Sequence, residues 1–462
     1  MTSVVQIPDT VERVRTGFET GVLRTIASRR AQLEQLRRLL VEQEDRLVDA
    51  LAIDVGKPRI EAYTTEIAFT VNEIDHTLKH LEAWNKPHKV KVPLTFKPGS
   101  GRLHPQPLGT VCIIAPWNYP VQLLLAPLVP ALAAGNTAVL KPSEVTPTVA
   151  AAIADLVPRY LDERAVAVVP GAVDETTALL EQRFDHIFYT GNGTVGRVVM
   201  TAAAKHLTPV TLELGGKSPA IVAADANIQV AARRIAWGKF VNAGQTCVAP
   251  DHVLVEESVE QEFLDALSAA ITEFYGADPS TSPDYARIVT EGHFDRLMGL
   301  LDAGGYDSTV VGGSGERNAR YLAPTVLAGV KPDAAVMAEE IFGPILPVIP
   351  VTDVDEAVRF VNDRDKPLAL YAFSSSARTL EKIVDRTSSG GVTLNHVLLH
   401  LAVPDLPFGG VGPSGMGAYH GKAGFDIFSH AKPVLDKPTR PDPSLMYPPY
   451  TSLKSKLLRR FL

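Results

Sequence analysis

Residues 186–216 of the 462-residue chain read H-I-F-Y-T-G-N-G-T-V-G-R-V-V-M-T-A-A-A-K-H-L-T-P-V-T-L-E-L-G-G. An apolar β-type run, 186–189, leads through a glycine turn into an alanine-rich helical stretch at 194–205, and a second apolar run follows at 210–214. A strand, a helix and a further strand in this order form the βαβ unit of a parallel sheet. The stretch therefore predicts an α/β fold.

The same alternation of strands and helices extends on both sides of this stretch. Upstream, we expect strands at 110–115, 137–140 and 165–169 and helices at 9–54 (one or two), 61–84, 122–134 and 146–157. Downstream, after Gly215-Gly216, a second α/β part is expected to about residue 410, with strands at 220–222, 252–255, 310–311, 346–351, 370–373 and 391–394.

Two segments depart from this alternation. Residues 85–107 are rich in Lys, Pro and Gly and are typical of an exposed strand or linker. The C-terminal tail is Pro-rich and then basic, with Leu453, Leu457 and Phe461 on one face of an amphipathic segment. That face suits weak contact with an anionic membrane surface, or docking on a neighbouring subunit or on the chain's own core. We favour docking.

Composition excludes several classes of protein. Apolar content is 45% and charged content 21%, as in ordinary globular proteins, and the net charge of −7 gives no reason to expect a nucleic-acid partner. Prolines interrupt the most apolar region, 111–140, and the N-terminus lacks a signal-peptide pattern, so no integral membrane span is expected. Two cysteines and no C-x-x-C or H-E-x-x-H pattern predict a cytoplasmic protein without a metal site.

Cys247, in N-A-G-Q-T-C-V-A-P, is the candidate nucleophile. Glu213, a carboxylate at the expected end of a strand, is the candidate base that activates the thiol or, later, a water. The alternative is a buried cysteine that packs as a small hydrophobe, and we assign that role to Cys112 in V-C-I-I-A.

Three further motifs follow expected strands. Gly191-Asn192-Gly193-Thr194-Val195-Gly196 opens a helix, where amide groups and the helix dipole favour a phosphate; the alternative is a plain glycine turn. Lys141 and Glu144, in K-P-S-E, are placed to bind ribose hydroxyls, or else form a solvated loop. Asn118, in A-P-W-N-Y-P, can donate its amide to an oxyanion, or else caps a turn.

Together these motifs resemble the NAD(P)-dependent aldehyde dehydrogenases over essentially the whole chain. The matching stretches are A-P-W-N-Y-P, K-P-S-E, F-Y-T-G-N-G-T-V-G, L-E-L-G-G-K-S-P, G-Q-T-C, E-E-I-F-G-P and L-P-F-G-G-V-G-P-S-G-M-G. The class 3 branch, which takes fatty and aromatic aldehydes, is similar in E-A-Y-T-T-E-I, N-E-I-D-H-T-L-K-H-L, S-G-M-G-A-Y-H-G-K and the C-terminal tail.

The resemblance implies a role for each matching position. Cys247 would be the nucleophile, Glu213 the general base, and Asn118 with the Cys247 amide the oxyanion hole. The residues implied at the cofactor are Lys141, Glu144, Gly191, Asn192, Gly193, Thr194, Val195, Gly196, Glu340 and Phe342, and Glu340 is also a second candidate base. The residues implied at the substrate pocket are Tyr63, Tyr119, Thr246, Phe408 and His420.

The resemblance also implies a domain organisation. A Rossmann-like NAD(P)-binding domain would comprise 1–84 and 108–212, and an α/β catalytic domain 213–410. A small β-rich oligomerisation element and tail would comprise 85–107 and 411–462, in a homodimer. His396 and His252 differ from the branch and bear on the substrate rather than on the reaction.

The implied reaction oxidises an aldehyde to the carboxylic acid through a thiohemiacetal and a thioester on Cys247. Glu213 favours hydrolysis of that thioester over transfer to coenzyme A, and Glu144 favours NAD, with NADP as a second cofactor. Two other functions stay open: a cofactor-free cysteine hydrolase of activated esters, and a non-catalytic structural protein on the same scaffold.

Overall fold

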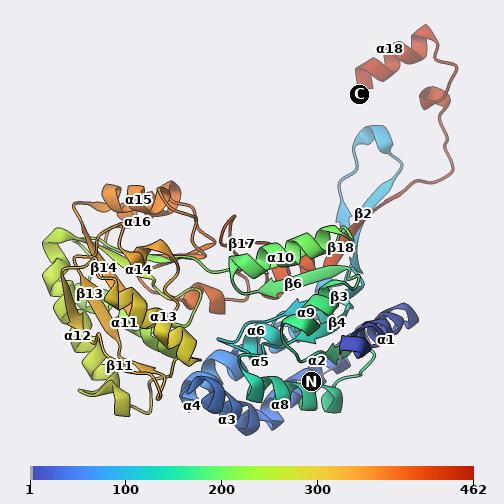
Figure 1. Ribbon diagram of the computed structural model, residues 1–462. Helices are drawn as coiled ribbons and strands as arrows, with labels where there is room; N and C mark the ends of the chain where they lie inside the picture. Colours follow the sequence, from blue (N-terminus) through green and yellow to red (C-terminus); the bar gives the residue numbers. More distant parts are fainter. Residues whose placement is uncertain (1–3, 462) are drawn as a thin grey trace.

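The computed structural model describes residues 4–461, whose larger sheets form two α/β parts that lie side by side (Figure 1). The six-stranded sheet has the order β17-β7-β6-β3-β4-β5, with strands Gly415–Met416, Val210–Glu213, His186–Thr190, Thr110–Ile114, Thr137–Lys141 and Val166–Val168. Its neighbours pair in parallel except β17, which is antiparallel to β7. The expected α/β fold and all five strands expected here are confirmed.

Helices cover both faces of this sheet. On one face lie α1 (Ile7–Thr20), α9 (Val173–Leu180) and α10 (Gly193–Ala204), and fully buried Cys112 belongs to the core beneath them. On the other face lie α2 (Ile26–Glu42), α3 (Glu44–Val55), α7 (Leu128–Ala134) and α8 (Pro147–Tyr160). The core position of Cys112 agrees with the packing role expected for it.

The seven-stranded sheet has the order β10-β13-β14-β9-β8-β15-β16. Its strands are Ser308–Val311, Thr325–Ala328, Ile345–Val351, His252–Glu256, Pro219–Val222, Ala369–Phe373 and Gly391–Leu394. Only the edge strand β10 pairs antiparallel. Around it lie α11 (Ile228–Phe240), α12 (Glu260–Tyr275), α13 (Glu291–Asp302), α14 (Ala335–Ala338), α15 (Val354–Asn362) and α16 (Ala377–Arg386). Strand β13 and the small pair β11 (Gly315–Glu316) and β12 (Tyr321–Leu322) were not expected from the sequence.

A β-arm projects from the first α/β part. It consists of β1 (His88–Val90), β2 (Ser100–Pro107) and β18 (Ser429–Asp436), and β2 pairs antiparallel with β18 along its whole length. The C-terminal helix α18 (Ser452–Phe461) lies beyond the tip of the arm, away from both α/β parts (Figure 1). The β character expected for 85–107 is therefore confirmed.

Two details of the expected domain ranges differ from this topology. Glu213 is the last residue of β7 and so belongs to the six-stranded sheet. Residues 415–427, expected with the oligomerisation element, return to that part of the molecule. Strand β17 pairs with β7, and α17 (Gly421–Ile427) packs on α5 (Phe69–Trp84) and α7.

Three expected helices are more broken than their apolar periodicity suggests. The segment 9–54 contains α1, α2 and α3, because Gly21 ends α1 in a left-handed conformation (φ 82°) and Thr25 caps α2. Helix 122–134 is split into α6 (Gln122–Leu125) and α7 by Pro127. Helix 61–84 begins earlier, as α4 (Arg59–Ala62), and passes through a π-helical turn, Tyr63–Ala68, before α5 (Phe69–Trp84).

Across residues 4–461, none of the helices is both long enough and apolar enough to cross a membrane.

Candidate active site

The carboxyl ends of four neighbouring parallel strands carry the first group of candidate residues. Asn118 follows β3, Lys141 ends β4, Gly191 follows β6 and Glu213 ends β7. Strands β4 and β5 continue on one side of β3, whereas β6 and β7 lie on the other. Open parallel sheets bind ligands at such a reversal of strand order, so the topology brings these four residues to one crevice edge.

The glycine turn is tied to the strand that ends in Glu213. The Gly191 amide donates to Glu213 O over 3.0 Å, and Asn192 caps α10 by accepting from the Val195 amide over 2.9 Å. A Cβ on Gly191 would lie 2.2 Å from the Tyr189 hydroxyl, and one on Gly196 3.2 Å from the Leu214 side chain. The close packing requires glycine at the first position and leaves the first turn of α10, including exposed Thr194, open to a phosphate.

Lys141 and Glu144 form a pair at the end of β4. The ammonium of buried Lys141 lies 3.0 Å from Glu144 Oε2 and donates to Pro142 O over 2.8 Å. The Glu144 side chain is 46% exposed, so its carboxylate also has room for a ribose hydroxyl. These residues, with the α10 turn, fit an adenosine diphosphate moiety.

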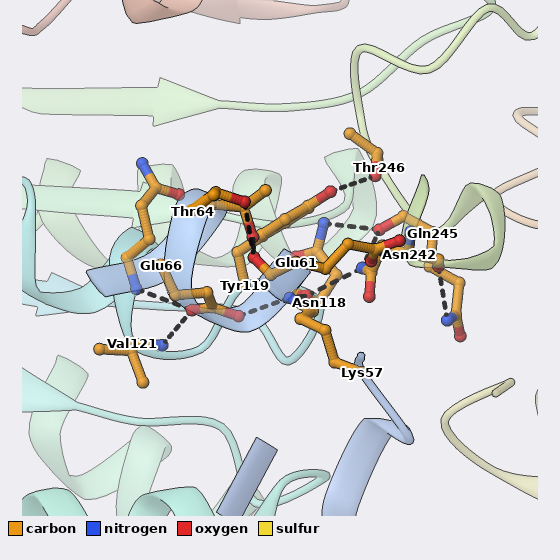
Figure 2. Close-up of polar contacts among 12 residues, drawn as sticks. Lys57, Glu61, Thr64, Glu66, Asn118, Tyr119, Val121, Asn242, Gln245 and Thr246 are labelled. Atoms are coloured by element: carbon orange, nitrogen blue, oxygen red, sulfur yellow. Dashed lines mark hydrogen bonds and ion pairs between the residues drawn. The ribbon is translucent and has the colours of Figure 1, made fainter. Parts of the chain in front are cut away.

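The cysteine loop meets the loop after β3. Cys247 lies between the turn Val241–Gly244 and β9. Asn118 Nδ2 donates to Gln245 O over 3.0 Å, and the Tyr119 and Thr246 hydroxyl oxygens are 2.7 Å apart, as Figure 2 shows. The structure therefore brings Asn118, Tyr119 and Thr246 to the segment that carries Cys247.

The charges of two carboxylates, buried Glu213 and half-buried Glu340, act on the Cys247 thiol. Among the described residues, neither oxygen of Glu213 has a hydrogen-bond partner, nor has Oε1 of Glu340. Burial raises the pKa of Glu213 well above its usual value. Burial, with the nearby charge of Asp251, raises the pKa of Glu340 to about 8. Unpaired buried carboxylates are costly to a fold, and they are typical of groups that take part in chemistry.

The pKa of the Cys247 thiol is also raised. Burial, with the charges of Glu340 and Glu213, raises the pKa of Cys247. The thiol is therefore protonated at neutral pH in this arrangement, so it requires a base to accept its proton as the sulfur attacks.

The loop that carries Glu340 is held on both sides. Lys217 Nζ forms an ion pair with Asp251 and donates to Glu339 O over 2.9 Å, and the Ile341 amide donates to Asp251 over 2.9 Å. The next residue, Phe342, has a φ of 49° and packs edge-on against Trp117, with ring centroids 5.3 Å apart. This clamp directs Glu340 toward Gly215.

We expect Gly215→Ala to displace the Glu340 carboxylate while the fold is retained. A Cβ on Gly215 would lie 2.0 Å from Glu340 Oε2. The Glu340 carboxylate would have to move, because it is the end of a flexible side chain. Steady-state kinetics should show kcat/KM lowered about 10-fold or more, since a misplaced site group costs up to about 100-fold. Gly299→Ala is the control, because its added Cβ meets no atom within 4 Å. Unchanged kinetics for Gly215→Ala would contradict a role for Glu340.

The remaining pocket candidates are divided between two places. Phe408 and His420 are buried, lie with ring centroids 5.9 Å apart and both contact Tyr419, whose hydroxyl senses the charges of Glu213 and Cys247. Tyr63 lies on the π-helical turn and is 40% exposed. Phe408 and His420 therefore lie close to Glu213 and Cys247, whereas Tyr63 lies at the protein surface.

A surface hollow of about 620 Å³ lies between α11 and the loop after β16. Trp237, Arg234, His396 and Leu399 are among the residues that line it, and none of the candidate site residues does. Among the described residues, no group of three or more His, Cys, Asp or Glu is placed to hold a metal ion.

Several residues at the site were missed from the sequence. Lys57, Glu66 and Asn242 contact the Asn118 loop, and Lys217 and Asp251 clamp the Glu340 loop. Each of them lies far along the chain from the candidate it contacts, so no local spacing marks it. Asn242 and Gln245 lie in N-A-G-Q-T-C-V-A-P, Lys217 in L-E-L-G-G-K-S-P and Glu66 in E-A-Y-T-T-E-I, but these stretches do not indicate which distant loop each side chain contacts.

Comparison with known proteins identifies the class. Residues 2–434 match the model of the Aldehyde dehydrogenase family. The chain belongs to the aldehyde dehydrogenase family, and it is an enzyme that oxidises aldehydes with NAD or NADP as acceptor.

Its relatives place it in the family 3 branch. It is 48% identical to aldehyde dehydrogenase family 3 member A2 of Macaca fascicularis over 98% of this chain and 94% of the relative. It is 48% identical to the dimeric, NADP-preferring aldehyde dehydrogenase of Rattus norvegicus, over 93% and 94%. The substrate-bound structure of Staphylococcus aureus AldH superposes with a TM-score of 0.96 at 45% identity, covering 98% of this chain and 99% of that one.

Proposed function

We propose that Cys247, Asn118, Glu213 and Glu340 are the reacting site of this enzyme, and that Cys247 forms the covalent intermediates. The observation that carries the proposal is the contact of the Asn118 amide with the cysteine loop, where the charges of Glu213 and Glu340 act on Cys247 and, within residues 4–461, neither oxygen of buried Glu213 has a hydrogen-bond partner. One amide hydrogen of Asn118 is bonded to Gln245 O, and the other is available to a substrate oxygen.

The first half of the reaction is attack on the aldehyde. Cys247 Sγ adds to the carbonyl carbon as its proton passes to a carboxylate, and the new oxyanion accepts hydrogen bonds from Asn118 and the Cys247 amide. Oxidation of the thiohemiacetal to a thioester on Cys247 would need a hydride acceptor, which NAD or NADP would supply when bound. Lys141, Glu144 and the turn 191–196 would hold the adenosine half, and Glu340 and Phe342 the nicotinamide ribose.

The second half is hydrolysis. Glu213, or Glu340 as a second base, takes a proton from a water that attacks the thioester carbon, and the Asn118 amide again holds the oxygen. Collapse of that intermediate returns the sulfur and releases the carboxylic acid. Because its pKa is raised, each carboxylate is a stronger proton acceptor, once ionised, than an ordinary exposed carboxylate.

The cofactor preference is proposed to depend on Glu144. Its carboxylate accepts a ribose 2′-hydroxyl and repels a 2′-phosphate, whereas Lys141, 3.0 Å away, offsets part of that repulsion. We expect Glu144→Gln to raise the NADP-to-NAD ratio of kcat/KM about 10-fold, since the change removes one repulsive charge. Initial rates with each cofactor test this, with exposed Glu262→Gln on α12 as a surface control. An unchanged ratio would contradict the assignment.

We also propose a medium- or long-chain aliphatic or an aromatic aldehyde as substrate, and a homodimer. The substrate class follows from the resemblance to the class 3 branch, and the homodimer is supported by the rat relative, which is named dimeric. The six-stranded part would bind the cofactor, the seven-stranded part would carry the nucleophile, and the arm with the tail would lie at the subunit contact. The low cysteine count supports a cytoplasmic location.

The test is a set of initial rates with short aliphatic, long aliphatic, aromatic and acidic aldehydes, each with NAD and with NADP. Turnover of long-chain or aromatic aldehydes that is lost in Cys247→Ala supports the proposal. Ester hydrolysis without nicotinamide, and no aldehyde oxidation, would point to a cysteine hydrolase instead.

A further inference from the structure

A buried ion pair lies behind the loop that carries Asn118. The side chains of Lys57 and Glu66 are both 0% exposed, and Lys57 Nζ lies 2.5 Å from Glu66 Oε1. Neither residue takes part in the proposed chemistry. We propose that the Lys57–Glu66 pair is a positioning device: it fixes the backbone of Asn118 and so aims the Asn118 amide at the reacting oxygen (Figure 2).

The Lys57 ammonium has one partner for each of its three N–H groups. The first is Glu66, the second is Asn118 O at 3.1 Å, and the third is the ring of Tyr119, whose centroid is 3.9 Å away. Asn118 O also accepts from Asn242 Nδ2 over 3.0 Å. The carbonyl of Asn118 is thus held from two directions.

The Glu66 carboxylate holds the other end of the same loop. Its Oε2 accepts from the Val121 amide over 2.9 Å and from the Gln122 amide over 3.0 Å. Hydrogen bonds to an ionised group are about twice as strong as neutral ones. The segment from Asn118 to Gln122 therefore cannot shift without breaking charge-assisted contacts at one end or the other.

The segment that supplies this pair reaches the cysteine loop as well. Glu61, between Lys57 and Glu66, accepts from the Asn242 amide over 3.0 Å. Asn242 in turn donates to Gln245 O over 3.1 Å, the same oxygen that Asn118 Nδ2 contacts. One short stretch, 57–66, thereby sets the distance between the amide donor and the loop of the nucleophile.

Stability alone does not account for this pair. Replacing a buried ion pair by uncharged side chains of similar volume is often neutral or stabilising, so a fold gains little from it. The position of Asn118 can matter far more, because a shift of about 1 Å in a catalytic group can lower the rate about 100-fold. The inference rests on the proposed role of Asn118.

The test uses the double variant Lys57→Met with Glu66→Gln in the full chain. It removes both charges together, keeps side-chain volume and keeps an acceptor for the Val121 and Gln122 amides. We expect kcat/KM for the aldehyde to fall about 10- to 100-fold with a cooperative melting transition. The matched control, Lys382→Met with Asp355→Asn, removes a partly exposed pair of 2.7 Å and should leave kcat/KM unchanged.

The decisive measurement repeats the double variant in an Asn118→Ala background. If the pair acts through Asn118, the double variant should cause no further loss of kcat/KM in the Asn118→Ala background. A general weakening of the fold would instead lower kcat/KM by the same factor in both backgrounds. Equal losses, or no loss in the native background, overturn the inference. Full kcat/KM for Asn118→Ala alone would overturn the proposed role of Asn118 and the inference with it, so the two failures are distinguishable.

If the double variant does not melt cooperatively, Glu66→Asp alone replaces it, because this change keeps both charges of the buried pair and only shortens the carboxyl side chain by one methylene. That change weakens the hold on Lys57 but keeps the Lys57 contact with Asn118 O, so we expect a smaller loss, about 3- to 10-fold, again absent in the Asn118→Ala background. A loss of the same size in both backgrounds overturns the inference.

Discussion

Cys247→Ala is expected to lower the rate of aldehyde oxidation by about 10⁴-fold or more and to leave the binding of NAD within about twofold. Loss of a covalent nucleophile removes the pathway itself, and effects of this size are typical of such residues. Cofactor binding should persist because the proposed cofactor contacts lie at the ends of β4 and β6, in α10 and in the loop of Glu340 and Phe342, all outside the cysteine loop. Initial rates and NAD titration by fluorescence measure the two quantities.

Cys112→Ala is the matched control for this prediction. Cys112 is fully buried in the core under α1, α9 and α10, so its loss should lower the melting temperature slightly and leave kcat unchanged. Mass spectrometry of the native enzyme, trapped during turnover, should find the acyl group on the peptide that contains Cys247. An acyl group on another residue, or near-normal oxidation by Cys247→Ala, would show that the nucleophile is misassigned.

Glu213→Gln is expected to lower kcat about 10²- to 10⁴-fold, the usual contribution of a general base, with the thioester accumulating on Cys247. Glutamine keeps the size of the side chain but cannot take a proton from water. Rapid mixing should still show one burst of NAD(P)H per active site, followed by slow turnover. Loss of the burst itself would instead place Glu213 in the first half of the reaction.

Glu340→Gln separates the two candidate bases by pH. The Glu340 carboxyl, with a pKa of about 8, is protonated below that pH and accepts a proton only above it. If Glu340 shares the base role, kcat of the native enzyme rises as pH increases through about 8, and Glu340→Gln removes that rise. A pH profile identical in the two enzymes would leave Glu213 as the base for hydrolysis.

The candidate site could be predicted to the extent that its residues lie at strand ends. Asn118, Lys141, Gly191 and Glu213 each follow or end an apolar run, and parallel strands place their carboxyl ends along one edge. Local periodicity therefore indicated both the strands and the residues beside them. The breaks in the helices were missed where a single residue, such as Pro127, overrides an apolar pattern that continues across it.

The contacts of Glu340 could not be predicted in that way. Its carboxylate reaches Gly215 because Lys217 and Asp251 hold the loop, and these residues come from three separate parts of the chain. The sequence also placed Tyr63 with the pocket candidates, yet the π-helical turn leaves its side chain 40% exposed. A π-helical turn changes which residues face inward and has no periodicity of its own in the sequence.

By itself, the sequence determined the α/β class, the order of the strands along the chain and the residue types at their ends, because hydrophobic periodicity and glycine turns are local properties. Only the tertiary structure decided that Lys57 and Glu66 are buried together behind Asn118, and that the charges of Glu213 and Glu340 act on Cys247. The physical reason is that burial and charge pairing depend on which distant segments meet, and a residue's neighbours in the sequence do not specify that.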